Sequence, residues 1–232
     1  MALILNIETS TEVCSVSLSK NGKLILKKEN ADGKTHASLL TVFIQNIFKE
    51  SDFAVNQLDA VAVSKGPGSY TGLRIGVSTA KGIAFAANIP LISVSTLQAM
   101  ALGISEKYDN TNEQILFCPM IDARRMEVYS AFYNIDNKIV KEISADVIDN
   151  ASYVEYFKKN NLIFFGNGSK KCKTIITNKN AKFIDNILCS SENMIKFSEE
   201  AFKNSNFEDV AYFEPFYLKD FIATVARKNI FG

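Results

Sequence analysis

The opening stretch of this sequence carries three strand patterns in immediate succession, and this arrangement restricts the fold. Residues 3–8 form a short apolar run of the buried kind. Residues 14–19 alternate between apolar side chains and serine, which is the period of a half-buried strand. Asn21-Gly22 follows and favours a two-residue hairpin turn, so that residues 23–29 become a third, antiparallel strand. The chain therefore begins with a three-stranded antiparallel unit.

After this unit the hydrophobic period becomes helical. Apolar residues between positions 39 and 48 trace one broad stripe, which predicts a helix over 35–49 with Thr35 as its N-cap. A strand at 59–64, a glycine-rich turn, a helix to about residue 87, a strand at 91–94 and a helix from residue 96 follow. The order is βββαβαβα, which indicates a mixed sheet flanked by helices.

A similar order begins again after a polar stretch at 106–113. Strands are predicted at 115–121, 128–133, 138–144, 162–165 and 182–184, and helices near 152–158, 170–177 and 192–203. No residue-level repeat accompanies this duplication. We predict an α/β protein with two βββαβαβα domains, which is the plan of the actin, sugar-kinase and heat-shock ATPase fold. The expected domains are 1–105 and 106–214, with a C-terminal segment, 215–232, that returns to the first domain as a helix.

Composition restricts the kinds of binding partner and the cellular compartment that we expect for this chain. The formal net charge is +1 and the pI about 7.6, so any contact with RNA is expected to be local or shared with a partner. Four scattered cysteines without a CxxC pair favour a reducing, cytoplasmic location. The N-terminus resembles a strand rather than a leader, and the longest apolar region, 82–94, is broken by Asn88 and Pro90. We therefore expect no membrane association.

A glycine-rich run follows the predicted strand at 59–64. Five of the 11 glycines lie between Gly66 and Gly82, and the run Gly66-Pro67-Gly68-Ser69 opens a helix that Ser69 or Thr71 can cap. One interpretation is a phosphate cradle at the helix N-terminus, and the other is a tight turn with a closely packed helix. The spacing fits neither the P-loop nor the dinucleotide-binding pattern. In an arbitrary protein the tight turn is the commoner outcome.

Five segments carry a specific resemblance. The run GPGSYTGLRIG at 66–76, with IETST at 7–11 upstream and VSTL at 94–97 downstream, is similar to the TsaB (YeaZ) family. The segment IDARRMEVY at 121–129 resembles that family's IDAR-x-x-EVY segment, and EPFYLK at 214–219 resembles its EP-x-YLR tail. These matches occur in order and span nearly the whole chain.

The resemblance implies a fold, a pathway and partners. TsaB proteins are two-domain actin-like chains that bind and stabilise TsaD and, with the ATPase TsaE, support transfer of a threonylcarbamoyl group to the adenosine beside the tRNA anticodon. It further implies a homodimer when the chain is alone, tRNA reached indirectly through the complex, and no required cofactor. Two helices are implied as the partner interface, through Leu39, Leu40, Phe43, Ile44, Ile47, Arg74, Gly76 and Ala80. The alternative is that this apolar surface faces the chain's own sheet.

The residues argue independently against catalysis. A metal site of the TsaD type needs a pair of histidines, and this chain has only His36. Glu8 ends the first predicted strand where actin-fold kinases commonly have Asp followed by Gly, so a phosphate would be crowded. Binding of ATP or ADP is expected to be weak at best, at Glu8, Thr9, Ser10, Gly66, Gly68 and Ser69. A structural role for Glu8 would be to accept hydrogen bonds from Thr11 or Ser69.

Two further interpretations stay open. The charge-rich segment with Asp122, Arg124, Arg125 and Glu127 is expected to form structural ion pairs, with a binding role as the alternative, and Lys170-Lys171 is expected on a solvated face. Lys219 replaces the family's tail arginine and loses the bidentate fork, which weakens any anion contact there.

The alternative function is an ATP-dependent phosphotransferase for a small metabolite. A peptidase is a remote alternative because the chain has one histidine.

Overall fold

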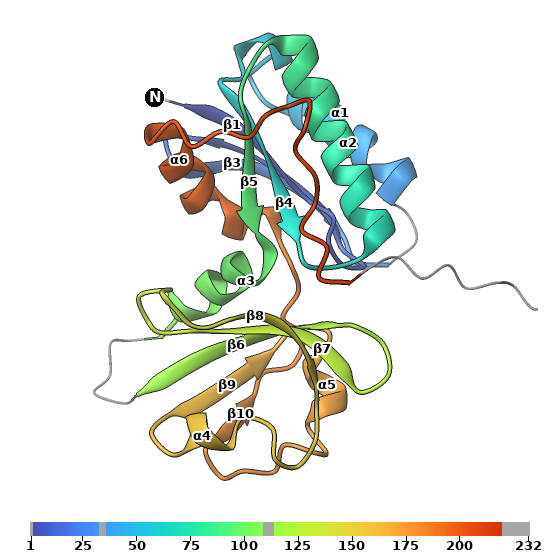
Figure 1. The fold of residues 1–232 in the computed structure, drawn as a ribbon. Helices are drawn as coiled ribbons and strands as arrows, with labels where there is room; N and C mark the ends of the chain where they lie inside the picture. The colour runs from blue at the N-terminus through green and yellow to red at the C-terminus, as the bar shows by residue number, and fades with distance from the viewer. Residues whose placement is uncertain (1, 33–35, 109–113, 220–232) are drawn as a thin grey trace, which may run out of the picture.

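The computed structural model describes residues 2–32, 36–108 and 114–219, and it contains two mixed sheets (Figure 1). The first half of the chain builds the first sheet and the helices α1, α2 and α3. The bounds are β1 Leu3–Glu8, β2 Cys14–Lys20, β3 Lys23–Asn30, α1 His36–Glu50, η1 Val55–Gln57, β4 Ala60–Gly66, α2 Tyr70–Ala87, β5 Leu91–Ser95 and α3 Thr96–Ser105.

The second half of the chain builds the second sheet with shorter helices. Its bounds are β6 Ile115–Asp122, β7 Glu127–Tyr133, β8 Ile139–Val147, α4 Val154–Phe157, β9 Asn161–Phe165, α5 Ser169–Cys172 and β10 Ala181–Phe183, followed by η2 Ser191–Met194 and α6 Ile195–Lys203. The helices expected near 152–158 and 170–177 are reduced to four residues each. Tyr153 precedes α4 with a left-handed backbone, which excludes the residues before it from the helix.

The two sheets have the same strand order. The first runs β3-β2-β1-β4-β5, and the second, read from its other edge, runs β8-β7-β6-β9-β10. In each sheet the first strand is antiparallel to the second and parallel to the fourth. This duplicated topology confirms the predicted fold, that of the actin-like and sugar-kinase proteins. The predicted hairpin at Asn21-Gly22 also forms, with both residues at positive φ.

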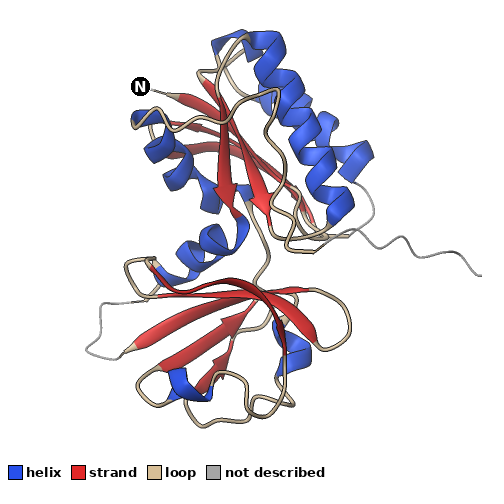
Figure 2. Cartoon of the chain, in the orientation of Figure 1, coloured by secondary structure: helices blue, strands red, loops and turns tan. Residues whose placement is uncertain are grey.

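Helices cover both faces of the first sheet (Figures 1 and 2). Leu3, Leu5 and Ile7 of β1 pack with α1 and α2, whereas Ile4 belongs to a separate cluster with Met194 and Phe197 on the face that η2 and α6 cover. Because side chains alternate across a strand, two helical layers bury β1 completely. This explains its continuous apolar sequence.

Helix α3 lies between the two sheets (Figure 2). Leu97, Met100 and Ile104 join a core cluster of the second sheet, while Ala99 packs in a cluster of the first. Eight of its ten residues are buried. A helix that is apolar on all sides needs packing partners on all sides, and the two sheets supply them.

The chain returns to the first sheet earlier than expected. We expected residues 106–214 in the second domain, but η2 and α6 contact β1 and β5 of the first sheet. Glu208 then pairs with Leu91, and its carboxylate accepts a hydrogen bond from the Ser93 hydroxyl at 2.5 Å. The expected C-terminal helix lies mostly outside the described residues, as does the predicted N-cap Thr35. The domain boundaries themselves stay predictions.

A compact polar cluster is enclosed by the second sheet and the segment before α4. The Asp146 carboxylate accepts hydrogen bonds from Ser130 (2.5 Å), Tyr153 (2.7 Å) and Ser144 (2.7 Å), and Lys141 lies 2.9 Å from it as an ion pair. Burial alone would raise the pKa of Asp146, but these four donors outweigh it and hold the pKa below its ordinary value. The cluster anchors Tyr153 in its left-handed conformation.

Within the described residues, no helix has the length and apolarity that crossing a membrane requires. The four cysteines, Cys14, Cys118, Cys172 and Cys189, are all buried and unpaired. Burial raises the pKa of each thiol, to about 11 for Cys14 and Cys172. These side chains therefore behave as small apolar core residues.

Candidate functional site

The glycine-rich loop packs directly against the end of β1. The Ser69 N–H donates to the Ser10 carbonyl at 2.6 Å. A Cβ on Gly68 would lie 2.2 Å from that same oxygen, and a Cβ on Gly72 would lie 2.1 Å from the Thr9 carbonyl oxygen. Glycine is required here because the chain itself occupies the space beside the loop. Ser69 also caps α2, since its hydroxyl accepts a hydrogen bond from the Gly72 N–H at 3.2 Å.

Thr9 joins this contact to the small-residue edge of α2. Its hydroxyl donates to the Gly72 carbonyl at 2.9 Å, and a Cβ on Gly76 would lie 2.2 Å from that hydroxyl oxygen. The edge of α2 that carries the small residues Gly72, Gly76 and Ala80 therefore packs against residues of the same subunit. Gly76 and Ala80, which the resemblance implies at a partner interface, are buried in this subunit.

Glu8 is 1% exposed. Its carboxylate accepts a hydrogen bond from the Ser10 N–H at 2.6 Å, so the expectation that Thr11 or Ser69 would donate is wrong. Burial raises the pKa of Glu8, and hydrogen bonds from Ser10 and Ser64 oppose that shift only in part. Glu8, Thr9 and Ser10 thus lie together with Gly66, Gly68 and Ser69, as the sequence suggested, in a packed arrangement. Nucleotide binding at these residues stays a prediction.

The outer side of α1 is apolar and accessible. Leu40, Ile44 and Ile47 face the core, whereas Leu39 and Phe43 are half-buried. Beyond them lies a groove of about 480 Å³, which we call the α1 groove, and Val42 and Val55 in its lining are 42% and 44% exposed. The groove is lined by Thr41, Val42, Ile44, Gln45, Phe48 and Val55.

Helix α2 also exposes side chains. Phe85 near its C-terminal end is 82% exposed, although α2 is otherwise anchored to the sheet by its small residues. Arg74 is exposed too, and its guanidinium carbon lies 4.1 Å from the centre of the Tyr70 ring, an arrangement favourable for a cation–π interaction. Only part of the interface set implied by the resemblance is therefore accessible in this subunit.

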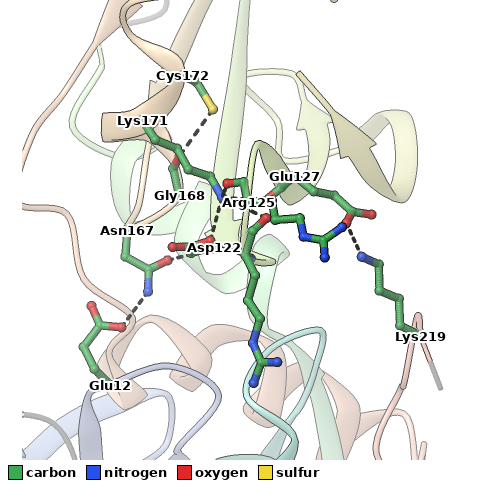
Figure 3. Close-up of polar contacts among 10 residues, drawn as sticks. Glu12, Asp122, Arg125, Glu127, Asn167, Gly168, Lys171, Cys172 and Lys219 are labelled. Carbon is green, nitrogen blue, oxygen red and sulfur yellow. Dashed lines mark hydrogen bonds and ion pairs between the residues drawn. The ribbon is translucent and has the colours of Figure 1, made fainter. Parts of the chain in front are cut away.

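The C-terminal tail packs on the glycine-rich loop. The Phe216 N–H donates to the Lys65 carbonyl at 2.7 Å, and the rings of Tyr217 and Tyr70 lie 5.0 Å apart. Lys219 then forms an ion pair with Glu127 of the second sheet (Figure 3). The tail and the IDARRMEVY segment, which are far apart in the sequence, therefore meet beside the loop.

The charged junction forms structural ion pairs, as expected, but their cations come from distant segments of the chain. The Asp122 carboxylate pairs with Lys171 at 2.6 Å, so both acids of this segment pair with distant lysines rather than with the neighbouring arginines (Figure 3). Lys171, expected on a solvated face, also donates to the carbonyls of Arg125 at 2.8 Å and Glu127 at 2.7 Å. No local sequence pattern marks Lys171 for this role, since its partners lie more than 40 residues earlier in the chain.

Asn167 and His36 make two further hydrogen bonds to the loop after β1. Asn167 donates to the Glu12 carboxylate at 2.5 Å, which links the second sheet to the loop after β1 (Figure 3). His36, the first residue of α1, is hydrogen-bonded through Nε2 to the Val13 carbonyl at 3.0 Å. Within the ranges that the structure describes, no three potential metal ligands gather.

The duplicated strand order and the helix shared by the sheets define an actin-like α/β protein. A family model described as TsaD, tRNA N6-adenosine threonylcarbamoyltransferase, matches residues 29–227. The chain is 40% identical over 126 residues to the tRNA threonylcarbamoyladenosine biosynthesis protein TsaB of Haemophilus influenzae, covering 54% of this chain and 51% of that protein. It is 30% identical over 176 residues to the Bacillus subtilis protein of the same name, covering 75% and 74%.

A solved structure titled YeaZ from Pseudomonas aeruginosa superposes with a TM-score of 0.79 at 24% identity, over 94% of this chain and 100% of that chain. The chain therefore belongs to the TsaB (YeaZ) family, within the wider family that the transferase model describes. Its aligned part spans about half the length of two of the curated relatives, those of Haemophilus influenzae and Escherichia coli.

Proposed function

We propose that this chain is a non-catalytic subunit that binds and stabilises TsaD and, with the ATPase TsaE, serves threonylcarbamoyl transfer to the adenosine beside the tRNA anticodon. Membership of the TsaB family supports the pathway, because its curated relatives are named for tRNA threonylcarbamoyladenosine biosynthesis. In this proposal the chain works in the cytoplasm, forms a homodimer when alone, reaches tRNA through the complex and needs no cofactor of its own.

The observation that carries the partner role is the α1 groove. An apolar surface rimmed by polar residues is typical of a site for another protein. Val42 and Val55 line the groove, and Phe85 adds exposed apolar area on the neighbouring helix. A helix of TsaD, or of a second copy of this chain, would bury this surface through apolar anchors at helical spacing.

The packed glycine-rich loop supports the non-catalytic part of the proposal. The Ser69 N–H, which could bind an anion at the start of α2, is already hydrogen-bonded to Ser10. The buried carboxylate of Glu8, when ionised, would repel a phosphate placed beside it. His36 is the only histidine in the sequence, and its ring is hydrogen-bonded to the backbone carbonyl of Val13.

A pair of valine variants tests the partner role. Val42→Lys places a charge in the α1 groove, and Val147→Lys places the same charge on β8, where Val147 is 71% exposed. We expect Val42→Lys to weaken association with TsaD by about 10- to 100-fold, because a buried lysine would lack a counter-ion. Val147→Lys should associate like the wild type. Size-exclusion chromatography with light scattering, with and without TsaD, measures both.

Reconstitution of tRNA modification tests the pathway. Leaving out this chain should abolish or strongly reduce the threonylcarbamoyl product. Undiminished product would contradict the proposed role, as would a wild-type chain that stays monomeric both alone and with TsaD. Robust magnesium-dependent ATP turnover by the purified chain would instead favour the alternative, a phosphotransferase for a small metabolite.

A further inference from the structure

The turn between β6 and β7 holds two adjacent arginines in an unfavourable backbone conformation. Arg124 and Arg125 have φ values of 70° and 45°, in the left-handed region that Asn and Gly adopt more readily. The Glu127 N–H donates to the Arg124 carbonyl at 3.1 Å, and the Ala123 N–H donates to the Glu127 carbonyl at 3.0 Å. Such residues persist where the surroundings over-determine them, and they cluster at functional sites.

Lys171 supplies much of this restraint. Its ammonium group donates to the carbonyls of Arg125 and Glu127 and pairs with the Asp122 carboxylate, so one side chain fixes both sides of the turn (Figure 3). The Asp122 carboxylate in turn accepts from the Arg124 N–H at 2.8 Å. The turn is thus rigid although it lies at the surface.

The same contacts leave the two guanidinium groups without partners. The nearby carboxylates Asp122 and Glu127 are paired with lysines, and Glu12 accepts a hydrogen bond from Asn167. Among the residues that the structure describes, neither arginine side chain makes a hydrogen bond, ion pair or ring contact, and both are exposed. The adjacent arginines Arg124 and Arg125 therefore carry two positive charges that form no ion pair among the described residues.

We propose that Arg124 and Arg125 bind phosphate groups of an RNA backbone. A guanidinium group presents a planar set of donors that matches a phosphate in two-point contacts, and a rigid turn reduces the entropy lost when both arginines bind. The choice of RNA over other phosphate carriers rests on the proposed role in tRNA modification. With a net charge of only +1 on the chain, this pair supplies a local contact rather than a general affinity for nucleic acid.

The test measures binding of an unmodified tRNA transcript between 50 and 200 mM salt, to the full chain alone and mixed with TsaD. In Arg124→Asn/Arg125→Gly the new residues favour the backbone of the turn, so the unfolding midpoint should stay the same or rise. Loss of two phosphate contacts should reduce the slope of log K against log salt by about 1.4 to 1.8. Arg124→Lys/Arg125→Lys should retain most of that slope, because the charges remain.

Lys158→Gln/Lys159→Gln is the matched control, because it removes two exposed positive charges near α4. An unchanged slope in the Asn/Gly variant, an equal loss in the control, or no tRNA binding in either mixture would overturn the inference. Competition by ATP or inorganic phosphate, at concentrations far below those of tRNA phosphate, would show that the arginines bind a nucleotide. Competition by polyglutamate as strong as that by tRNA would show that they bind an acidic protein. Either result would overturn the inference. Failure of the chain to associate with TsaD counts against the proposed function instead.

Discussion

The pKa values of a buried carboxylate, Glu8, and a half-buried one, Asp146, are shifted in opposite directions, and the hydrogen-bond donors around them explain why. Glu8 is fully enclosed, so burial raises its pKa despite hydrogen bonds from Ser10 and Ser64. Asp146 is less deeply buried, and its donors include the cation Lys141, so the net shift of its pKa is downward. Asp146 therefore favours its charged form in the folded state.

This shift gives Asp146 a pH-dependent contribution to stability. Because the folded pKa is lower than the unfolded one, which is about 3.9, the contribution is complete above that pH and is lost as the pH falls through the folded pKa. Asp146→Asn should lower the free energy of unfolding by about 1.5–3 kcal/mol at pH 7, since it removes charge-assisted hydrogen bonds and leaves Lys141 unpaired. Urea unfolding from pH 7 to pH 3 should show the difference shrinking only below about pH 4. A difference that does not depend on pH would contradict this account.

Among the helices, α2 carries glycines whose surroundings differ sharply. Gly72 faces the Thr9 carbonyl so closely that no side chain fits, whereas a Cβ on Gly82 would meet nothing within 4 Å. The sequence alone shows two glycines on the same helix. Only the packed structure distinguishes a close contact from an exposed position.

Alanine at these two sites should therefore have opposite effects. Gly72→Ala should destabilise the fold by about 1–3 kcal/mol, because the new methyl group forces the helix away from β1. Gly82→Ala should stabilise it by up to about 1 kcal/mol, because alanine has the higher helix propensity at an exposed position. Thermal and urea unfolding of the two variants and the wild type measure both signs. Equal effects would show that α2 does not pack on residues 9–10 as described.

In the molecule as a whole, the C-terminal tail connects the first sheet to the second through contacts with both. It pairs with β5 at Glu208, lies along the glycine-rich loop at Phe216 and ends the described chain at the ion pair of Lys219 with Glu127. Helix α3 makes the other connection, because it contributes to the cores of both sheets. The arrangement of the two sheets thus depends on one segment from the middle of the sequence and one near its C-terminal end.

Alanine variants of two tyrosines in the tail, Tyr217 and Tyr212, test whether the tail is held in this position. The Tyr217 ring packs against the Tyr70 ring at a tilt of 40°, whereas Tyr212 in the same tail is 84% exposed. Tyr217→Ala should remove about 0.5–1.5 kcal/mol of ring contact and loosen the tail locally. Hydrogen exchange at the Phe216 N–H, which is bonded to the Lys65 carbonyl, should then become about 2- to 10-fold faster. Tyr212→Ala should leave that exchange unchanged; acceleration in both variants would mean that the ring contact does not hold the tail.

Much of the fold could be predicted because it depends on short-range patterns. The alternation after β1, the Asn21-Gly22 turn and the helical stripe of α1 each reflect local backbone geometry and predicted the first unit, and similar local patterns after residue 114 predicted the second. The packing of residues 9–10 against the glycine-rich loop was also open to prediction, since only glycine allows so close an approach. The short length of α4 was not, because hydrogen bonds of Tyr153 to the side chains of Asp146 in β8 and Ser130 in β7 fix the start of α4.

Because hydrophobic period and turn chemistry act over a few residues, the order of strands and helices, the family and the glycine-rich turn could all be predicted from the sequence. Only the folded structure shows which glycines contact residues 9–10, that α6 returns to the first sheet, and that Lys171 and Lys219 rather than the arginines pair with Asp122 and Glu127. The physical reason is distance along the chain. Ion pairs and packing contacts form between groups that are close in space, and these two ion pairs join residues 49 and 92 positions apart in the sequence.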